Sequence, residues 1–131
     1  MAIFGIGAYY YGTTDVSNDF LTNNIVGTGW DVNAAPELHR YFKSLKVGDI
    51  IYIKAAFGPA KYISVKGIGI ISDNEILDTS HHHLTEIGRN VKWVKKTQFK
   101  LPKPVEKNNV RSNTVYEEFH PNIQEEIIKR I

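Results

Sequence analysis

The chain has 131 residues, a length that suits one domain and leaves little room for two. Hydrophobic residues make up 42% of it and charged residues 23%, the proportions of a globular protein with a real core. There is no cysteine, which excludes disulfides, thiolate nucleophiles and zinc sites built on cysteine. The net charge of +2 permits a polyanionic partner without requiring one.

The cellular setting follows from what the sequence lacks. No segment has the apolar length needed to cross a membrane, so we expect no membrane partner. The first ten residues, MAIFGIGAYY, carry neither the basic region nor the cleavage site of a signal peptide. Together with the absence of cysteine, these features indicate a cytoplasmic protein.

The first half of the chain predicts a strand, a loop, a helix and a strand. Residues 2–9 are apolar and predict a strand, whereas residues 12–33, rich in Gly, Thr, Asn and Asp, predict a long irregular connection. A helix is expected over 36–45, with Pro36 at its first position and one apolar stripe formed by Leu38, Tyr41, Phe42 and Leu45. Residues 50–57 are β-branched and aromatic, and predict a strand that ends at the turn Gly58-Pro59.

A second long strand is expected over 61–72. In an extended strand, Gly67 and Gly69 share one face with Ile63, Val65 and Ile71, and glycines at such positions indicate a bend or a close backbone approach.

The remaining chain predicts a loop, a strand, a connection and a helix. Residues 73–87 are polar, and residues 89–99 predict a strand with Val91 and Trp93 facing inward. Residues 100–113 predict a connection, and residues 121–131 a short helix with one apolar side formed by Ile123, Ile127, Ile128 and Ile131.

The order of these elements predicts the fold class. Several strands follow one another without intervening helices, which argues against a doubly wound sheet. We therefore expect a single α+β domain over residues 1–131, a small mixed β-barrel with helices packed on its rim.

Motifs of familiar enzymes and metal sites are missing. The sequence has no G-x-S-x-G, H-E-x-x-H or P-loop motif, and the glycine pair Gly5 and Gly7 lacks the third glycine of a dinucleotide site. The acids Asp73, Glu75 and Asp78 are expected to be solvated. The run 81–83 is three histidines whose side chains point in different directions, so we expect no metal and no other cofactor.

Aromatic and polar residues form the informative constellation. A site that reads an unstacked base needs flat apolar surfaces and a few groups for the base edge. The candidates are Tyr9, Tyr10, Tyr11, Trp30, Asp31, Asn33, Lys54 and Phe57. Two alternatives stay open: the Trp30 ring packs beneath the helix as core, and at least one tyrosine faces the core by strand alternation.

A run of lysines could hold a nucleic-acid backbone. The candidates for phosphate contact are Lys92, Lys95 and Lys96, and the run continues with Lys100, Lys103 and Lys107. The alternative is a solvated strand edge, where lysines discourage aggregation.

Two stretches resemble the EVE branch of the PUA-like superfamily, which is related to the YTH and ASCH domains. They are GTGWDVNAAPELHRYFKSLKVGDIIYIKA at 27–55 and ISVKGIGIIS at 63–72. As in that branch, a Trp and an Asn precede a helix, a Gly-Asp turn and a strand, and a Gly-Ile-Gly strand follows. With a Val-x-Trp pair at 91–93, the sequence looks closest to the EVE-like domains of modification-dependent restriction systems, over about residues 2–97.

The resemblance implies a PUA-like barrel whose pocket accepts a flipped, modified base in DNA or RNA. Trp30 matches the cage Trp, and Asp31 and Asn33 match the polar residues beside it. Where EVE proteins usually carry a Tyr followed by a His-Ser pair, this chain has Ile53-Lys54-Ala55. The function expected is therefore a non-catalytic nucleic-acid-binding module, with any effector on a separate protein.

Two other functions remain open. The first is a small hydrolase that resembles ASCH enzymes and acts on modified nucleosides, with Lys54 and a carboxylate from Glu37 or Glu75. Its hydroxyl would come from Thr13, Thr14 or Thr28. The second is a protein-interaction module on the same fold.

Overall fold

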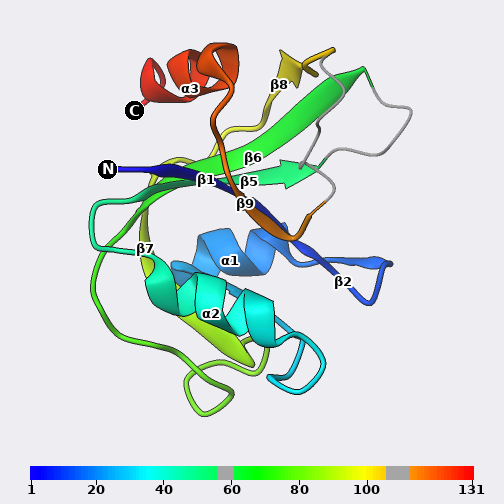
Figure 1. Cartoon of the computed structure of the whole chain (residues 1–131), viewed down its shortest axis with the longest axis vertical. Helices are drawn as coiled ribbons and strands as arrows, with labels where there is room; N and C mark the ends of the chain where they lie inside the picture. Colours follow the sequence, from blue (N-terminus) through cyan, green and yellow to red (C-terminus); the bar gives the residue numbers. More distant parts are fainter. Residues whose placement is uncertain (56–60, 106–112) are drawn as a thin grey trace.

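The computed structural model describes residues 1–55, 61–105 and 113–131 (Figure 1). The strands are β1 (Ile3–Gly7), β2 (Tyr9–Tyr10), β3 (Thr14–Asp15), β4 (Ile25–Thr28), β5 (Ile50–Ala55), β6 (Tyr62–Ile71), β7 (Ile87–Lys95), β8 (Phe99–Pro102) and β9 (Val115–Glu117). The helices are α1 (Ser17–Asn23), α2 (Pro36–Ser44) and α3 (Pro121–Ile128). In these parts of the chain no helix is both long enough and apolar enough to cross a membrane.

One strongly curled sheet organises the molecule. Its strands run in the order β4-β7-β6-β5-β1-β9, and β8 pairs with β6 beyond the end of the β6–β7 ladder. β1 and β5 are parallel, whereas the other described pairs are antiparallel. The result is a half-barrel in a mixed α+β fold, which confirms the predicted class (Figure 1).

The two faces of the sheet bury separate cores. Neighbouring residues of a strand point to opposite faces, so β5 sends Ile51 and Ile53 into one core cluster and Ile50 and Tyr52 into the other. The first cluster includes residues of α1 and α2, and the second includes residues of α3. In Figure 1, α3 accordingly lies on the other side of the sheet from α1 and α2.

The prediction of an irregular connection over 12–33 is wrong. This stretch contains β3, α1 and β4, and all four β4 residues are buried. α1 has seven residues and buries Phe20 completely, while Asn24 ends it in a left-handed conformation with φ of 56°. Elements this short contain too few residues for an apolar periodicity to be recognised among the Asn, Thr and Gly residues of this stretch.

The predicted apolar face of β6 is only partly correct. Ile63 and Val65 pack in the second core cluster, but Ile71 packs in the first. The pairing register of β6 shifts once against β5 and once, between Ile68 and Gly69, against β7. In the shift against β5 the extra residue, Lys66, lies in β6 and interrupts the alternation of its side chains, so the strand changes faces there. In the shift against β7 the extra residue, Val94, lies in β7.

Glycine allows the bent part of β6 to pack closely. A Cβ atom on Gly67 would lie 2.8 Å from Leu21 Cδ2, and one on Gly69 would overlap Val91 Cγ1. Backbone of β7 is also close, because these Cβ atoms would lie 3.3 Å from Lys95 O and 3.1 Å from Lys92 O, so the predicted close backbone approach is present at both glycines, and side chains of α1 and β7 come closer still.

The remaining helices and strands agree only in part with the sequence predictions. α2 lies where predicted, and β7 buries Val91 and Trp93 as expected. The connection predicted from residue 100 begins instead as strand β8, which pairs with the first half of β6. The C-terminal helix ends at Ile128, short of the predicted residue 131; Ile123 and Ile127 are buried in it, whereas Ile128 and, beyond the helix, Ile131 are about half-exposed.

Candidate functional site

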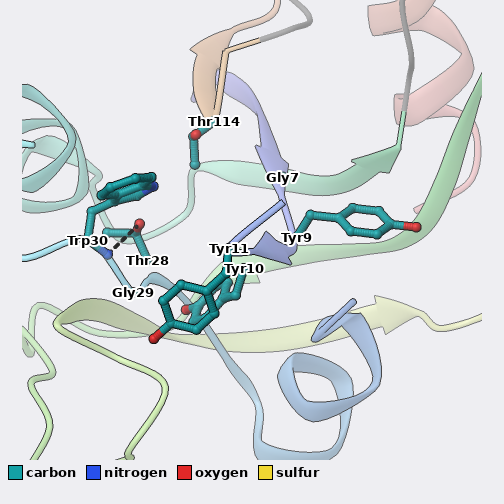
Figure 2. Close-up of a pocket in the computed structure, with 8 residues that line it drawn as sticks. All are labelled: Gly7, Tyr9, Tyr10, Tyr11, Thr28, Gly29, Trp30 and Thr114. Carbon is teal, nitrogen blue, oxygen red and sulfur yellow. Dashed lines mark hydrogen bonds between the residues drawn. The ribbon is translucent and has the colours of Figure 1, made fainter. Parts of the chain in front are cut away.

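An open hollow lies where β1 passes into β2, beside the end of β4 and the start of β9 (Figure 2). It has a cavity volume of about 40 Å³, and about 360 Å³ with its open mouth. The residues that line it are Gly7, Tyr9, Tyr10, Tyr11, Thr28, Gly29, Trp30 and Thr114. A hollow of this kind, apolar with a few hydroxyl groups, suits one small planar group better than an extended ligand.

Trp30 presents its side chain to this hollow from a fixed backbone. The Trp30 N–H donates to Thr28 Oγ1 at 3.3 Å, and the Trp30 carbonyl accepts a hydrogen bond from His39 Nε2 at 2.7 Å. His39 is buried in α2, so the predicted helix holds the residue in place. The side chain itself is 55% exposed, so the indole does not belong to the core.

The three consecutive tyrosines have different environments. Tyr10 is buried, packs its ring edge against Phe20 and donates its hydroxyl to Leu84 O at 2.6 Å, which confirms that one tyrosine faces the core. Burial raises the pKa of this hydroxyl well above its ordinary value. Tyr9 and Tyr11 are 43% and 83% exposed, but the Tyr9 ring points away from Trp30, and Lys66 Nζ lies 5.4 Å from its centroid, so of these two rings only that of Tyr11 stays on the Trp30 side (Figure 2).

The tight β2–β3 hairpin sets the position of Tyr11. Tyr11 and Gly12 both have left-handed backbones, with φ of 57° and 71°, and lie within the three-residue connection between the paired Tyr10 and Thr14, where the Thr13 N–H donates to Tyr10 O at 3.2 Å. An ion pair between Asp15 and Lys66 ties the hairpin to β6. This pair, with a hydrogen bond from Ser17 N–H, lowers the pKa of the Asp15 carboxyl, although partial burial opposes the shift.

Several predicted site residues lie outside this lining. Asp31 uses Oδ1 to accept a hydrogen bond from the Ala34 N–H at 2.8 Å, which shapes the entry to α2. Asn33 is exposed next to it. Phe57 is outside the described residues. The structure therefore gathers Trp30 and the tyrosines in one hollow, but it does not place Asp31 or Asn33 among the lining residues.

Lys54 lies directly behind the hollow. Gly7, which lines the hollow, is the register partner of Lys54 in the parallel β1–β5 pair. The Lys54 side chain is buried, and its Nζ lies 5.6 Å from the centroid of the Tyr116 ring. Burial lowers the pKa of the Lys54 amine to about 8.

A buried polar network lies behind Lys54 that the sequence did not reveal. The hydroxyls of Tyr52 and Tyr116 are 2.7 Å apart, and the Tyr52 hydroxyl donates to Glu118 Oε1 at 2.7 Å. Glu118 is 1% exposed, and its Oε2 accepts from the His120 N–H at 3.0 Å. Burial raises the pKa of Tyr52 well above its ordinary value. Tyr52 stands in a continuous apolar run of β5 that gives no sign of a polar contact, and β9 is too short to be noticed as a strand.

The lysines predicted to hold a backbone lie on and just after β7. Lys92 and Lys96 are exposed, while Lys95 is half-buried with its Nζ 5.7 Å from the centroid of the Phe99 ring. None of them lines the hollow.

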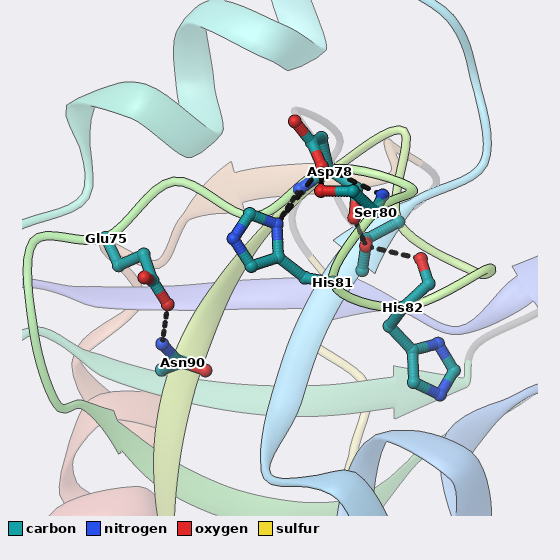
Figure 3. Close-up of polar contacts among 7 residues, drawn as sticks. Glu75, Asp78, Ser80, His81, His82 and Asn90 are labelled. Atoms are coloured by element: carbon teal, nitrogen blue, oxygen red, sulfur yellow. Dashed lines mark hydrogen bonds and ion pairs between the residues drawn. The ribbon is translucent and has the colours of Figure 1, made fainter.

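The loop that carries the histidine run 81–83, here called the histidine loop, makes polar contacts within itself (Figure 3). His81 Nδ1 lies 3.1 Å from Asp78 Oδ1, whereas His82 points away from it and stacks on His83 with centroids 4.6 Å apart. Across the described residues, no group of three or more His, Asp or Glu side chains could hold a metal ion. The loop supports the hollow through Leu84, whose carbonyl accepts from Tyr10.

The residues of the hydrolase alternative are only partly brought together. Thr28 lines the hollow, but Lys54 does not, and Thr13 and Thr14 are exposed in the hairpin. Neither predicted carboxylate lines the hollow: Glu37 is exposed on α2, and Glu75 accepts from Asn90 Nδ2 at 3.0 Å (Figure 3).

The sequence was compared with protein-family models and with curated proteins. No protein-family model matches the sequence, and no curated protein matches it either.

Proposed function

We propose that this protein is a non-catalytic nucleic-acid-binding module whose hollow takes one flipped base. A single observation carries the proposal: a half-exposed indole, held by its backbone on both sides, lines an open hollow together with the exposed Tyr11. An aromatic ring left in water at a fixed place is available for stacking, and a stacked base gains about 1–3 kcal/mol.

The hollow also offers groups that can read the edge of a base. Thr28 and Thr114 bring hydroxyls to its lining, and Gly7 and Gly29 leave backbone atoms accessible because they have no side chain. Hydroxyls can donate and accept hydrogen bonds, so they can adapt to either kind of edge. Turning a base out of a duplex costs a few kcal/mol, which stacking and edge contacts together can offset.

The fold and the surface charge are compatible with this role. We propose that the curled half-barrel is a PUA-like domain of the EVE kind, in which Trp30 serves as the cage residue. The exposed Lys92 and Lys96, with Lys95 between them, would contact phosphates, and binding would then weaken steeply with added salt.

The test compares the truncation of two aromatic side chains that are exposed to nearly the same extent. Trp30→Ala removes the stacking ring, whereas Tyr62→Ala removes a ring that is 53% exposed on β6 and does not line the hollow. We expect Trp30→Ala to lose most of the binding to single-stranded oligonucleotides with modified bases, and Tyr62→Ala to retain it. Equal binding by both variants would refute the proposal.

A second function has one observation in its favour. The buried Lys54, with its pKa lowered to about 8, has the properties of a general base, and it pairs in register with Gly7, which lines the hollow. Incubation with acylated cytidines distinguishes the two functions, because turnover that is lost in Lys54→Met supports a hydrolase, while binding without turnover supports the reader.

A further inference from the structure

Thr28, the last residue of β4, brings a buried hydroxyl to the hollow. It lines the hollow, although only 2% of its surface is exposed. Other parts of the molecule lie against the glycines on both sides of it. A Cβ atom on Gly27 would lie 2.6 Å from the Ile87 carbonyl oxygen, and one on Gly29 would lie 3.0 Å from the Tyr10 ring. The backbone around Thr28 is therefore fixed, and its side chain stands at a fixed place.

The oxygen of this hydroxyl is already engaged as an acceptor. The Trp30 N–H donates to Thr28 Oγ1 at 3.3 Å (Figure 2). Among the residues that the structure describes, none accepts a hydrogen bond from the Thr28 O–H. A hydroxyl has one proton and two lone pairs, so with one lone pair used, the proton is the group that still needs a partner. Because protein encloses Thr28 elsewhere, the hollow is the direction from which that partner comes.

We propose that the Thr28 hydroxyl selects the occupant of the hollow by donating a hydrogen bond to its edge. The ligand class is then a flat heterocycle with an acceptor on the facing edge, either a carbonyl oxygen or an unprotonated ring nitrogen. A hydrocarbon ring of the same shape is disfavoured. This inference rests on the proposed function and specifies its ligand, because nucleobases carry such acceptors and the phenyl ring of a partner protein carries none.

The same hydroxyl connects the edge of the ligand to the stacking ring. The Trp30 N–H, the Thr28 hydroxyl and a ligand acceptor form a chain in which each group donates to the next. Hydrogen bonds in such a chain strengthen one another, so this ligand also strengthens the bond that holds the Trp30 backbone. A ring without an acceptor gains stacking alone and leaves a buried proton unpaired. We expect acceptor-bearing rings to bind roughly 5- to 100-fold more tightly than hydrocarbon rings of the same shape.

Matched rings and two substitutions of Thr28 test the inference. Thymidine is compared with the difluorotoluene deoxynucleoside, and deoxyadenosine with the methylindole deoxynucleoside, which keep the ring shapes and lack strong acceptors. Each ring is the single base of an otherwise abasic oligonucleotide. Thr28→Val keeps the side-chain shape and removes the hydroxyl, whereas Thr28→Ser keeps the hydroxyl and removes the methyl group. A change that loosens Trp30 weakens both rings of a pair alike, so the ratio of their affinities reports the edge contact alone.

Binding is measured by calorimetry at pH 7, and thermal unfolding verifies that each variant is folded. We expect the wild type and Thr28→Ser to prefer the acceptor-bearing ring of each pair. Thr28→Val should bind both rings of a pair about equally, and Trp30→Ala should bind all four weakly. The comparison within the wild type needs no variant, so it decides the ligand class even if Thr28→Val does not fold.

Three outcomes overturn the role of Thr28 and leave the reader intact. They are equal binding of both rings of a pair by the wild type, a preference that survives in Thr28→Val, and a preference that is lost in Thr28→Ser. A wild type that binds none of the four rings also overturns the inference. The reader is overturned with it when the oligonucleotides with modified bases fail to bind as well.

Discussion

Two groups of aromatic residues lie on either side of Gly7, and they differ in exposure: one group is buried and the other is exposed. Tyr52 and Tyr116 are 0% and 3% exposed, their rings meet edge to face, and their hydroxyls contact each other and Glu118. Trp30 and Tyr11 lie at the hollow with 55% and 83% of their surface exposed.

The difference between the groups lies in what holds each ring. In the buried pair the side chains themselves are held, by packing and by hydroxyl contacts, so their removal should cost stability. At the hollow the backbone is held instead, through His39 and Thr28 for Trp30 and through the hairpin turn for Tyr11. Removal of those rings should cost binding and spare the fold.

The largest effect is expected from Tyr52→Ala. The change empties a fully buried ring site and removes the hydrogen bond from the Tyr52 hydroxyl to Glu118 Oε1, so we expect a loss of about 3–5 kcal/mol in the free energy of unfolding. Urea denaturation measures it. A loss below about 1 kcal/mol would mean that the buried pair is not what stabilises this half of the molecule.

The glycines of β1 sharpen the comparison. A Cβ atom on Gly5 would overlap the ring of Tyr116, whereas one on Gly7 meets only ordinary contacts. Gly5→Ala should therefore lower the free energy of unfolding by about 1–3 kcal/mol, and Gly7→Ala should change it by less than about 0.5 kcal/mol. The two variants, made in one strand two residues apart, serve as controls for each other.

The pH dependence of the free energy of unfolding tests whether the charged Lys54 amine is buried between the two aromatic groups. Lys54 has a pKa of about 8 in the folded state and 10.5 in the unfolded chain, so between these values the unfolded chain binds more protons. Stability gains from this group as pH rises from 8 to 10.5, on the order of 1–2 kcal/mol.

That gain is measured as the difference between wild type and Lys54→Met, in which the titrations of Tyr10 and Tyr52 cancel. The difference should be constant below pH 8 and should shift in favour of the wild type above it. A difference that stays flat across this window contradicts the burial of a charged amine at this place.

The smallest effect on stability is expected from Trp30→Ala and Tyr11→Ala. Alanine keeps both backbone hydrogen bonds of residue 30, and both side chains are largely in water, so the free energy of unfolding should change by less than about 0.5 kcal/mol. Thermal unfolding monitored by circular dichroism measures the change. A larger loss would place the indole among the residues that stabilise the fold.

The sequence predicted the elements that repeat a pattern for long enough. The helix over 36–45 and the strands around 50, 61 and 89 each carry several apolar positions in one period, so their type and place could be predicted. α1, β4 and β9 are short, and their burial depends on strands far away in the chain. No local pattern contains that information.

The sequence predicted the aromatic residues of the candidate site, because they are easily noticed in the sequence. Trp30 and the three tyrosines stand out, and the structure places them around one hollow. Gly7 and Thr114 could not be found in this way, because they join the lining through the pairing of β1 with β5 and β9. Asp31 has the residue type of a base reader, but it hydrogen-bonds the backbone of the turn before α2.

The two tryptophans of the chain lie in opposite settings, which gives the protein two built-in optical reporters. The indole of Trp93 is 9% exposed and donates its Nε1–H to Phe20 O at 3.0 Å, so its fluorescence changes when the core unfolds. The indole of Trp30 stands in water at the hollow, so a ring that stacks on it will quench its light. With either tryptophan changed to phenylalanine, occupancy and unfolding become separate fluorescence signals from one unlabelled molecule.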